Sequence, residues 1–179
     1  TRSDYYKVSL ATGERTLIAE ADYAGYRLSP AGKYVGTYNA TDSCWYTINL
    51  ADNRKIQLTT PQTFPAWDED NDVPNYPSPH GMAGWTKDDA ALLIYDRYDI
   101  WSFDPEGKKA PVRLTKDGRE KQVTYRRIVL DREQMDIDLK QPMMLTGFNE
   151  VDKSTAIYRA RLVAPSTPAL LAGGAFNYG

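Results

Sequence analysis

Short apolar runs alternate with turn residues along the stretch from Gly84 to Gly107. Two of these runs, Leu92–Ile94 and Ile100–Phe103, are separated by only a short polar segment. The Lys-Asp-Asp sequence at 87–89 and the Asp-Pro-Glu-Gly sequence at 104–107 favour chain reversal, because Asp, Pro and Gly each stabilise turns locally. The pattern therefore predicts consecutive β-strands, with the two apolar runs paired as a β-hairpin.

The same arrangement recurs elsewhere in the chain. The segments that align are residues 28–35 with 85–92, residues 45–50 with 100–105, and residues 58–59 with 114–115. Residues 6–13 resemble the second hairpin of each copy, and a degenerate copy covers residues 143–162. A four-strand unit that recurs roughly every 40 to 60 residues is typical of a β-propeller blade.

The repeat divides the chain into six segments. They are a half blade at 1–20, a blade at 21–60, an acidic proline-rich loop at 61–81, blades at 82–116 and 117–172, and a lead-in to a further blade at 173–179. The predicted fold class is all-β, a partial β-propeller of three to four four-stranded antiparallel blades. Because complete propellers have about four to eight blades, we expect part of a larger ring. At most a helical turn is expected, within 68–76 or 131–136.

Ten apolar side chains are expected to be buried between the sheets, because the sheets of a propeller pack face to face. They are Leu28, Val35, Trp45, Ile48, Trp85, Leu92, Ile94, Ile100, Phe103 and Leu145. The long third blade is expected to contain a strand at 123–130 and another at 143–148.

Composition excludes several classes of function. The chain has 179 residues, which suits one domain of ordinary size, and its net charge of −2 gives no electrostatic reason to expect nucleic acid or an anionic membrane as a partner. No apolar run approaches the roughly 20 residues of a membrane-spanning helix. The single cysteine, Cys44, excludes an internal disulfide and is expected to pack as a small apolar group. A first residue other than methionine suits a piece of a longer protein or a processed one.

Five prolines and the acidic run 68–72 set residues 61–81 apart from the repeats, and long ordered loops are often functional. Asp68, Asp70 and Asp72 have the opening spacing of an EF-hand calcium loop. That motif next requires Gly at its sixth position and Glu at its twelfth, where this chain has Val73 and Pro79. We therefore expect no metal site, and a looser calcium site is the alternative.

The carboxylates of this loop are instead expected to form turns or to meet cationic side chains, with Arg97 as one candidate. In the neighbouring segment 95–99, two acids, one base and two phenols lie together. We expect Asp96 and Asp99 to accept hydrogen bonds from backbone amides of the turn, with Arg97 bridging them. The alternative is that the segment lines the mouth of a channel.

Ser78 and His80 place a hydroxyl and an imidazole close together in the sequence. A catalytic triad needs both groups to meet in space with a third group that orients the base, and sequence proximity does not provide this. No Gly-x-Ser-x-Gly nucleophile motif is present in the 179 residues. We therefore predict no catalytic residue and no cofactor. The sequon at 39–41 is a weak motif in an expected tight turn.

Several of these segments resemble known propeller repeats. Ser-Pro-Ala-Gly-Lys at 29–33, Asp-Ile-Trp-Ser-Phe-Asp at 99–104, and the two Leu-Thr pairs resemble the repeat of TolB-like propellers, which also occurs in serine peptidases of the prolyl oligopeptidase family (S9). The stretch from Trp67 to Trp101 is more similar to that peptidase family, in particular to large secreted members from Bacteroidetes. In that family the propeller caps an α/β-hydrolase domain that carries the catalytic Ser, Asp and His, none of which matches a position here.

The resemblance implies a non-catalytic propeller segment that restricts the access of peptides to a hydrolase domain elsewhere in the same parent chain. It also implies a periplasmic or secreted location. By itself this chain is expected to have no hydrolytic activity. A TolB-like propeller that binds a protein partner is the main alternative, and a propeller glycosidase or lyase with inward carboxylates is a third.

An incomplete propeller leaves sheet edges and apolar faces uncovered. Tyr6 and Val8 are expected to be uncovered at one end, and Leu145, Ile157 and Leu162 at the other. We therefore expect two or more copies to associate through these terminal blades, with a monomer as the alternative.

Overall fold

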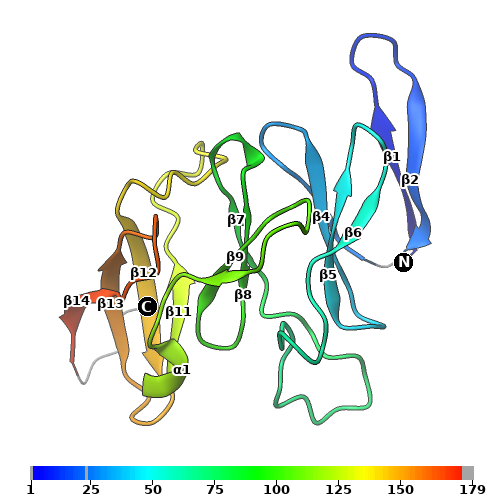
Figure 1. The fold of residues 1–179 in the computed structure, drawn as a ribbon. Helices are drawn as coiled ribbons and strands as arrows, with labels where there is room; N and C mark the ends of the chain where they lie inside the picture. The colour runs from blue at the N-terminus through cyan, green and yellow to red at the C-terminus, as the bar shows by residue number, and fades with distance from the viewer. Residues whose placement is uncertain (1, 23, 175–179) are drawn as a thin grey trace.

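The computed structural model describes residues 2–22 and 24–174, and within them the chain is almost entirely β-structure. Figure 1 shows four antiparallel sheets standing side by side in chain order. A two-stranded N-terminal hairpin is followed by three four-stranded sheets, which we call the first, second and third sheets. Each is a meander in which consecutive strands pair. The predicted all-β class is confirmed, although the sheets are not closed into a ring.

The two apolar runs at 92–94 and 100–103, predicted to pair as a hairpin, form neighbouring antiparallel strands. The N-terminal hairpin contains β1 (Ser3–Val8) and β2 (Arg15–Asp22), and the first sheet contains β3 (Tyr26–Leu28), β4 (Tyr34–Asn39), β5 (Cys44–Asn49) and β6 (Lys55–Gln57). The second sheet contains β7 (Met82–Trp85), β8 (Leu92–Tyr95), β9 (Ile100–Phe103) and β10 (Val112–Arg113). The third sheet contains β11 (Val123–Arg127), β12 (Met143–Asn149), β13 (Thr155–Ala160) and β14 (Ala169–Gly173).

Helical structure occurs at places that the sequence analysis did not predict. A 3₁₀ turn covers Lys87–Asp89 and a single α-helical turn, α1, covers Gly118–Lys121, whereas no helix forms at 68–76 or 131–136. The first follows Thr86, whose Oγ1 accepts a hydrogen bond from the Ala91 amide and so closes the connection between β7 and β8. No helix among the described residues is long and apolar enough to cross a membrane.

Two other boundaries also differ from expectation. The strand predicted at 123–130 ends at Arg127, where its last pairing with β12 is to Leu145. Gly173, expected in a lead-in to a further blade, instead pairs with Ala156 as the last residue of β14. Residues 175–179, the remainder of that expected lead-in, lie outside the described residues.

The second sheet packs against both of its neighbours through the two faces of β8. Leu92 and Ile94 belong to a core shared with the first sheet, which also contains Trp45. Leu93 and Tyr95 belong to a core shared with the third sheet. Successive side chains of a strand point to opposite faces, so the uninterrupted apolar run of β8 reflects burial on both sides.

Nine of the ten side chains predicted to be buried are buried, and Leu28 is the exception because it is 64% exposed. It lies at the end of the edge strand β3 and lines a groove of about 860 Å³ between the N-terminal hairpin and the first sheet. The hairpin does not fill this groove, and so it leaves Leu28 uncovered.

The outer face of the third sheet also differs from expectation. Leu145 and Leu162, expected on an uncovered face, are fully buried in the core shared with the second sheet. Ile157 of β13 lies on the other face of the third sheet, away from that core, and is only partly buried. Phe148 is 39% exposed. The third sheet therefore directs its more apolar face inward.

Four connections between paired strands share one six-residue conformation. In each, the first and fourth side chains accept hydrogen bonds from backbone amides two or three residues further on, and the fifth residue has a positive φ. The four are residues 9–14, 39–44, 49–54 and 149–154. Ser, Thr, Asn and Asp suit the accepting positions because their short side chains reach the nearby backbone.

Equivalent hydroxyl groups occupy the same positions in the first and second sheets. Ser29 Oγ accepts a hydrogen bond from the Tyr34 amide at 2.9 Å, as Thr86 Oγ1 does from the Ala91 amide at 2.8 Å. Thr59 Oγ1 accepts from the amide of Trp45 at 2.8 Å. Its counterpart Thr115 Oγ1 accepts from the amide of Ile100 at 3.0 Å. These pairs match the sequence alignment, so the two sheets repeat one structural unit.

A buried carboxylate joins these two sheets. Asp89 follows β7, and its side chain accepts hydrogen bonds from Ser29 Oγ at 2.5 Å and from the amides of Ala31 and Lys33 at 3.0 and 3.2 Å. Because a buried carboxylate is stable only when it is well bonded, this contact fixes the turn of the first sheet against the second.

Candidate functional site: the acidic loop and the turn between β8 and β9

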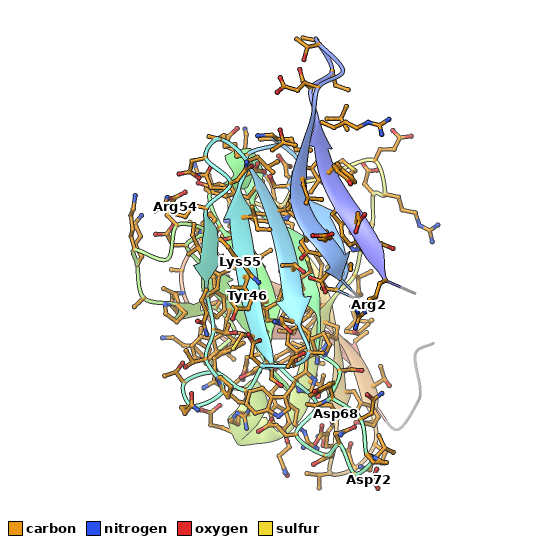
Figure 2. The ribbon with its side chains drawn as sticks, turned by 90° about the vertical axis from the view of Figure 1, so that its right-hand side faces the viewer. Arg2, Tyr46, Arg54, Lys55, Asp68 and Asp72 are labelled. Atoms are coloured by element: carbon orange, nitrogen blue, oxygen red, sulfur yellow. The ribbon has the colours of Figure 1, made fainter. Side chains whose placement is uncertain are left out.

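Residues 61–81, the acidic loop, fold back on themselves beneath the first and second sheets (Figure 1). Trp67 and Pro79 form a bridge, flanked by hydrogen bonds from the Asp68 amide to the Ser78 carbonyl at 2.8 Å and from the His80 amide to the Ala66 carbonyl at 3.0 Å. In Figure 2, Asp68 and Asp72 lie at one end of the molecule, away from Arg54 and Lys55.

Aromatic and small side chains anchor the start of this loop in the core. Phe64 and Ala66 are buried with residues of the first and second sheets, and the Phe64 ring meets those of Trp101 and Phe103 edge-on at 5.3 and 5.1 Å. Packing therefore holds the start of the loop, and backbone hydrogen bonds around the Trp67–Pro79 bridge hold its two sides together. Only its acidic tip, residues 68–72, depends on side-chain ion pairs.

The acidic tip meets arginines from the second sheet and α1. Asp70 pairs with Arg97 at 2.8 Å, and Glu69 pairs with Arg119 at 3.3 Å. Asp68 accepts a hydrogen bond from the Asp70 amide at 3.1 Å. The prediction that these carboxylates meet cations and form turns is confirmed at these positions.

The turn between β8 and β9 confirms the prediction for Asp96 and corrects it for Asp99. Asp96 accepts hydrogen bonds from the amides of Tyr98 and Asp99, at 2.8 and 2.5 Å, and from Trp101 Nε1 at 3.1 Å. Asp99 points out of the turn towards β10 and α1. Arg97 does not bridge the two acids, because its guanidinium turns instead to Asp70 and Glu150.

Arg97 connects three segments that are distant in sequence. Its Nε and Nη2 donate to the two carboxylate oxygens of Glu150 at 3.1 and 2.9 Å, and Nη2 also reaches Asp70. Tyr98 adds a hydroxyl bond to Glu150 at 3.0 Å. Burial raises the pKa of Glu150, but the hydrogen bonds from Arg97 and Tyr98 outweigh it, so its pKa lies below the ordinary value. The bidentate pair ties the acidic loop to the connection between β12 and β13.

Asp99 organises the other side of the turn. The buried carboxylate accepts hydrogen bonds from Thr115 Oγ1 at 2.7 Å, from the amides of Gly118 and Arg119 at 3.1 and 3.2 Å, and from Arg113 at 2.6 Å. This network fixes β10 and α1 against β9, and the sequence analysis did not anticipate it. The Thr, Arg and Gly partners follow the aspartate in the sequence, but their spacing has neither a helical nor a strand period. The spacing therefore does not predict these contacts.

Ser78 and His80 do not form a nucleophile–base pair in the described part of the chain. Ser78 is exposed, and the buried Nε2 of His80 has no hydrogen-bond partner among the described residues. Burial, followed by the positive charge of Arg126, lowers the pKa of His80. No carboxylate in residues 2–22 or 24–174 hydrogen-bonds this imidazole, so nothing orients it as a base.

The other candidate positions have structural contacts. Cys44 is buried beside Gln57, whose Nε2 lies 3.4 Å from its Sγ. The sequon residue Asn39 uses both ends of its amide in a turn, with its Oδ1 at 2.9 Å from the Thr41 amide and its Nδ2 at 3.3 Å from Asp42. Across the described residues, no three His, Cys, Asp or Glu side chains converge as metal ligands.

Comparison with known proteins does not identify the chain: no model of a known protein family matches it, and no curated protein does. The arrangement at this site is a set of ion pairs that clamps the acidic loop over the β8–β9 turn.

Proposed function

We propose that this chain is a non-catalytic β-propeller segment of a larger serine peptidase related to prolyl oligopeptidase. The observation that carries the proposal is two matched pairs of hydroxyl–amide contacts in the first and second sheets. Ser29 matches Thr86, and Thr59 matches Thr115. They make the two sheets copies of one four-stranded unit, which is how propeller blades are built.

The packing of the sheets supports the same proposal. Each four-stranded sheet packs face to face on the next through an apolar core, and each is an antiparallel meander, as in a series of blades. The outer face of the N-terminal hairpin carries Tyr6, Val8 and Leu17, each about half exposed. A further blade would cover such a face in a closed ring.

In this proposal the segment governs access to chemistry performed elsewhere. The catalytic Ser, Asp and His belong to an α/β-hydrolase domain of the same parent protein, and the propeller restricts which peptides reach it. The parent protein is placed in the periplasm or outside the cell, as in the family that residues 67–101 resemble. Its substrates are peptides.

The test uses the complete open reading frame that contains these residues. We expect it to encode a Gly-x-Ser-x-Gly motif outside residues 1–179, and we expect a fluorophosphonate probe to label the serine of that motif. Deleting residues 1–179 should raise cleavage of an unfolded protein substrate relative to a chromogenic dipeptide, because the gate is lost. Covalent labelling at Ser78, or equal effects on both substrates, would contradict the proposal.

A TolB-like binding propeller is the second candidate, because residues 29–33 and the two Leu-Thr pairs occur in that repeat as well. An open reading frame that encodes further blades and ends without a hydrolase motif would favour it. Affinity capture would then replace peptide cleavage as the relevant assay.

A further inference from the structure

A groove of about 820 Å³ lies between the first sheet and the acidic loop. Tyr38 of β4 and Trp45 of β5 line one side, and Tyr76 and Pro77 of the acidic loop line the other. Met82, at the start of β7, also contributes to the lining. Flat aromatic and proline surfaces of this kind suit an extended chain more than a compact ligand.

Arg27 is the uncompensated charge of this groove. It is exposed on β3, and its guanidinium makes no hydrogen bond or ion pair with the other residues that the structure describes. The second charged residue of the lining, Asp22, is already occupied: it accepts hydrogen bonds from the Tyr26 hydroxyl at 2.6 Å and the Ala24 amide at 2.9 Å. A monovalent anion is therefore the complementary group, and the guanidinium suits a carboxylate because it binds both oxygens.

One sheet edge adjoins the groove. β3 is the outermost strand of the first sheet, and Arg27 of β3 lines the groove together with Gly25, which precedes the strand. An edge strand presents backbone N–H and C=O groups on its open side, and extended peptides bind by adding to such edges.

Trp45, which lines the groove, has a buried polar group that lacks a partner in the described part of the chain. Trp45 is 5% exposed, and its Nε1 has no acceptor among the described residues. A buried donor without an acceptor is costly, and a peptide carbonyl would satisfy it.

We propose that this groove binds a short extended peptide, with a carboxylate of the peptide at Arg27 and an apolar side chain between Tyr38 and Tyr76. The carboxylate belongs either to the C-terminus of the peptide or to an acidic side chain. The proposal does not rest on the proposed function, because every residue named here lies within the described chain and binding is measured without catalysis.

The test is a chemical-shift titration of the ¹⁵N-labelled 179-residue chain. The first probe is N-acetylated leucyl-prolyl-phenylalanine with a free carboxylate. The second is its C-terminal amide, and the third is that amide extended by one glutamate. We expect the first probe to shift the Trp45 indole signal and the amides of Gly25, Gly81 and Met82, with saturable binding, and we expect the second to bind about tenfold more weakly.

Substitutions separate the charge from the aromatic surface. Arg27→Met keeps the apolar stem and removes the guanidinium, so it should weaken the first probe about tenfold and leave the second unchanged. Tyr76→Ala should weaken both. Arg15→Met removes an exposed arginine on β2, outside the groove, and serves as the matched control.

The third probe distinguishes the two sources of the carboxylate. Tight binding of the first probe alone assigns the terminal carboxylate, and tight binding of the third alone assigns an acidic side chain. Tight binding of both shows that either source suffices, and each of these results supports the proposal. Equal affinity for all three probes would overturn it. So would an unchanged affinity of Arg27→Met, or shifts confined to residues outside the groove.

Discussion

Asp99 shows how a single buried carboxylate organises segments that the sequence places far apart. Its hydrogen-bond donors lie 14 to 20 positions further along the chain, and one of them is the amide of Gly118. A Cβ at Gly118 would lie 2.6 Å from Asp99 Oδ1 and 2.8 Å from the Val123 carbonyl oxygen. The glycine is therefore required by close approach rather than by its backbone angles.

Gly118→Ala should destabilise the chain by about 1–3 kcal/mol, because either the carboxylate or the backbone must move to accept the methyl group. Urea unfolding followed by tryptophan fluorescence measures the change. Gly25→Ala is the control, since a Cβ there meets nothing within 4 Å, and it should cost much less. Equal effects of the two substitutions would contradict the role assigned to Asp99.

The lowered pKa of His80 predicts that the stability of the folded chain depends on pH. Burial and Arg126 lower its pKa, so the folded chain prefers the neutral imidazole. Its contribution to stability is complete above the ordinary pKa of about 6.5 and declines as the pH falls below that value, because the unfolded chain then binds the proton more readily. It is the only histidine in the sequence.

We therefore expect the free energy of unfolding to fall between pH 7 and pH 5, and to fall less in His80→Gln. Urea titrations at matched ionic strength measure both slopes. Identical slopes in the two proteins would show that the imidazole titrates with the same pKa in the folded and unfolded chains.

Residue-level burial was largely predictable from the sequence, whereas only some of the polar contacts were, such as those of Asp96 and the pairing of Asp70 with Arg97. Leu92, Ile94 and Ile100 lie in apolar runs, and burial follows from that composition. The pairing of Arg97 with Glu150 and the partners of Asp99 depend on which loops cross the end of the second sheet, and no local pattern encodes this. The one failed burial prediction, Leu28, depends on how closely the N-terminal hairpin approaches the first sheet.

At the scale of elements, the acidic loop is the segment whose position depends most on charge. Its start is packed in the core through Phe64, whereas its tip is held by Asp70 and Glu69 bonded to arginines. The contact of Asp70 with Arg97 is the more important of the two, because Arg97 also binds both carboxylate oxygens of Glu150 and so links the loop to the third sheet.

Arg97→Met should loosen the tip of the acidic loop while leaving the sheets intact. Removing the guanidinium leaves Glu150 without its cationic partner and should cost ~1–2 kcal/mol locally, or roughly a tenfold faster amide exchange in residues 68–78. Hydrogen–deuterium exchange at pH 7 measures this. Arg54→Met is the control, because Arg54 pairs with Glu106 and Asp52 at a different part of the molecule. Unchanged exchange in the loop would refute the clamp.

Strands were predictable because turn residues separate them, and the four matching six-residue turns show why. Their accepting side chains are Ser, Thr, Asn and Asp, which mark turns in any sequence. The helical turns at 87–89 and 118–121 were missed because contacts between segments stabilise them. Asp89 of the first accepts hydrogen bonds from Ser29, and Asp99 binds the amides that begin the second.

Within residues 2–22 and 24–174, both ends of the row of sheets remain open. At one end, Tyr6, Val8 and Leu17 share the outer face of the N-terminal hairpin, and each is about half exposed. At the other end, β14 is an edge strand in which all five residues are exposed, and Leu170 and Leu171 carry its apolar surface. Its sequence, Ala-Leu-Leu-Ala-Gly, contains none of the charged residues that usually protect a sheet edge.

We expect two or more copies of the 179-residue chain to associate through these ends, by edge pairing or by exchange of strands. Burial of apolar surface contributes roughly 25 cal/mol per Å², and pairing of β14 also satisfies the backbone groups on its open edge. Sedimentation equilibrium over a wide concentration range measures the mass. Leu170→Lys should shift the equilibrium towards the monomer because it places a charge on the edge, whereas Val73→Lys, at an exposed position in the acidic loop, should not. A mass of 20.2 kDa at every concentration would exclude association and show that the open ends are stable in water.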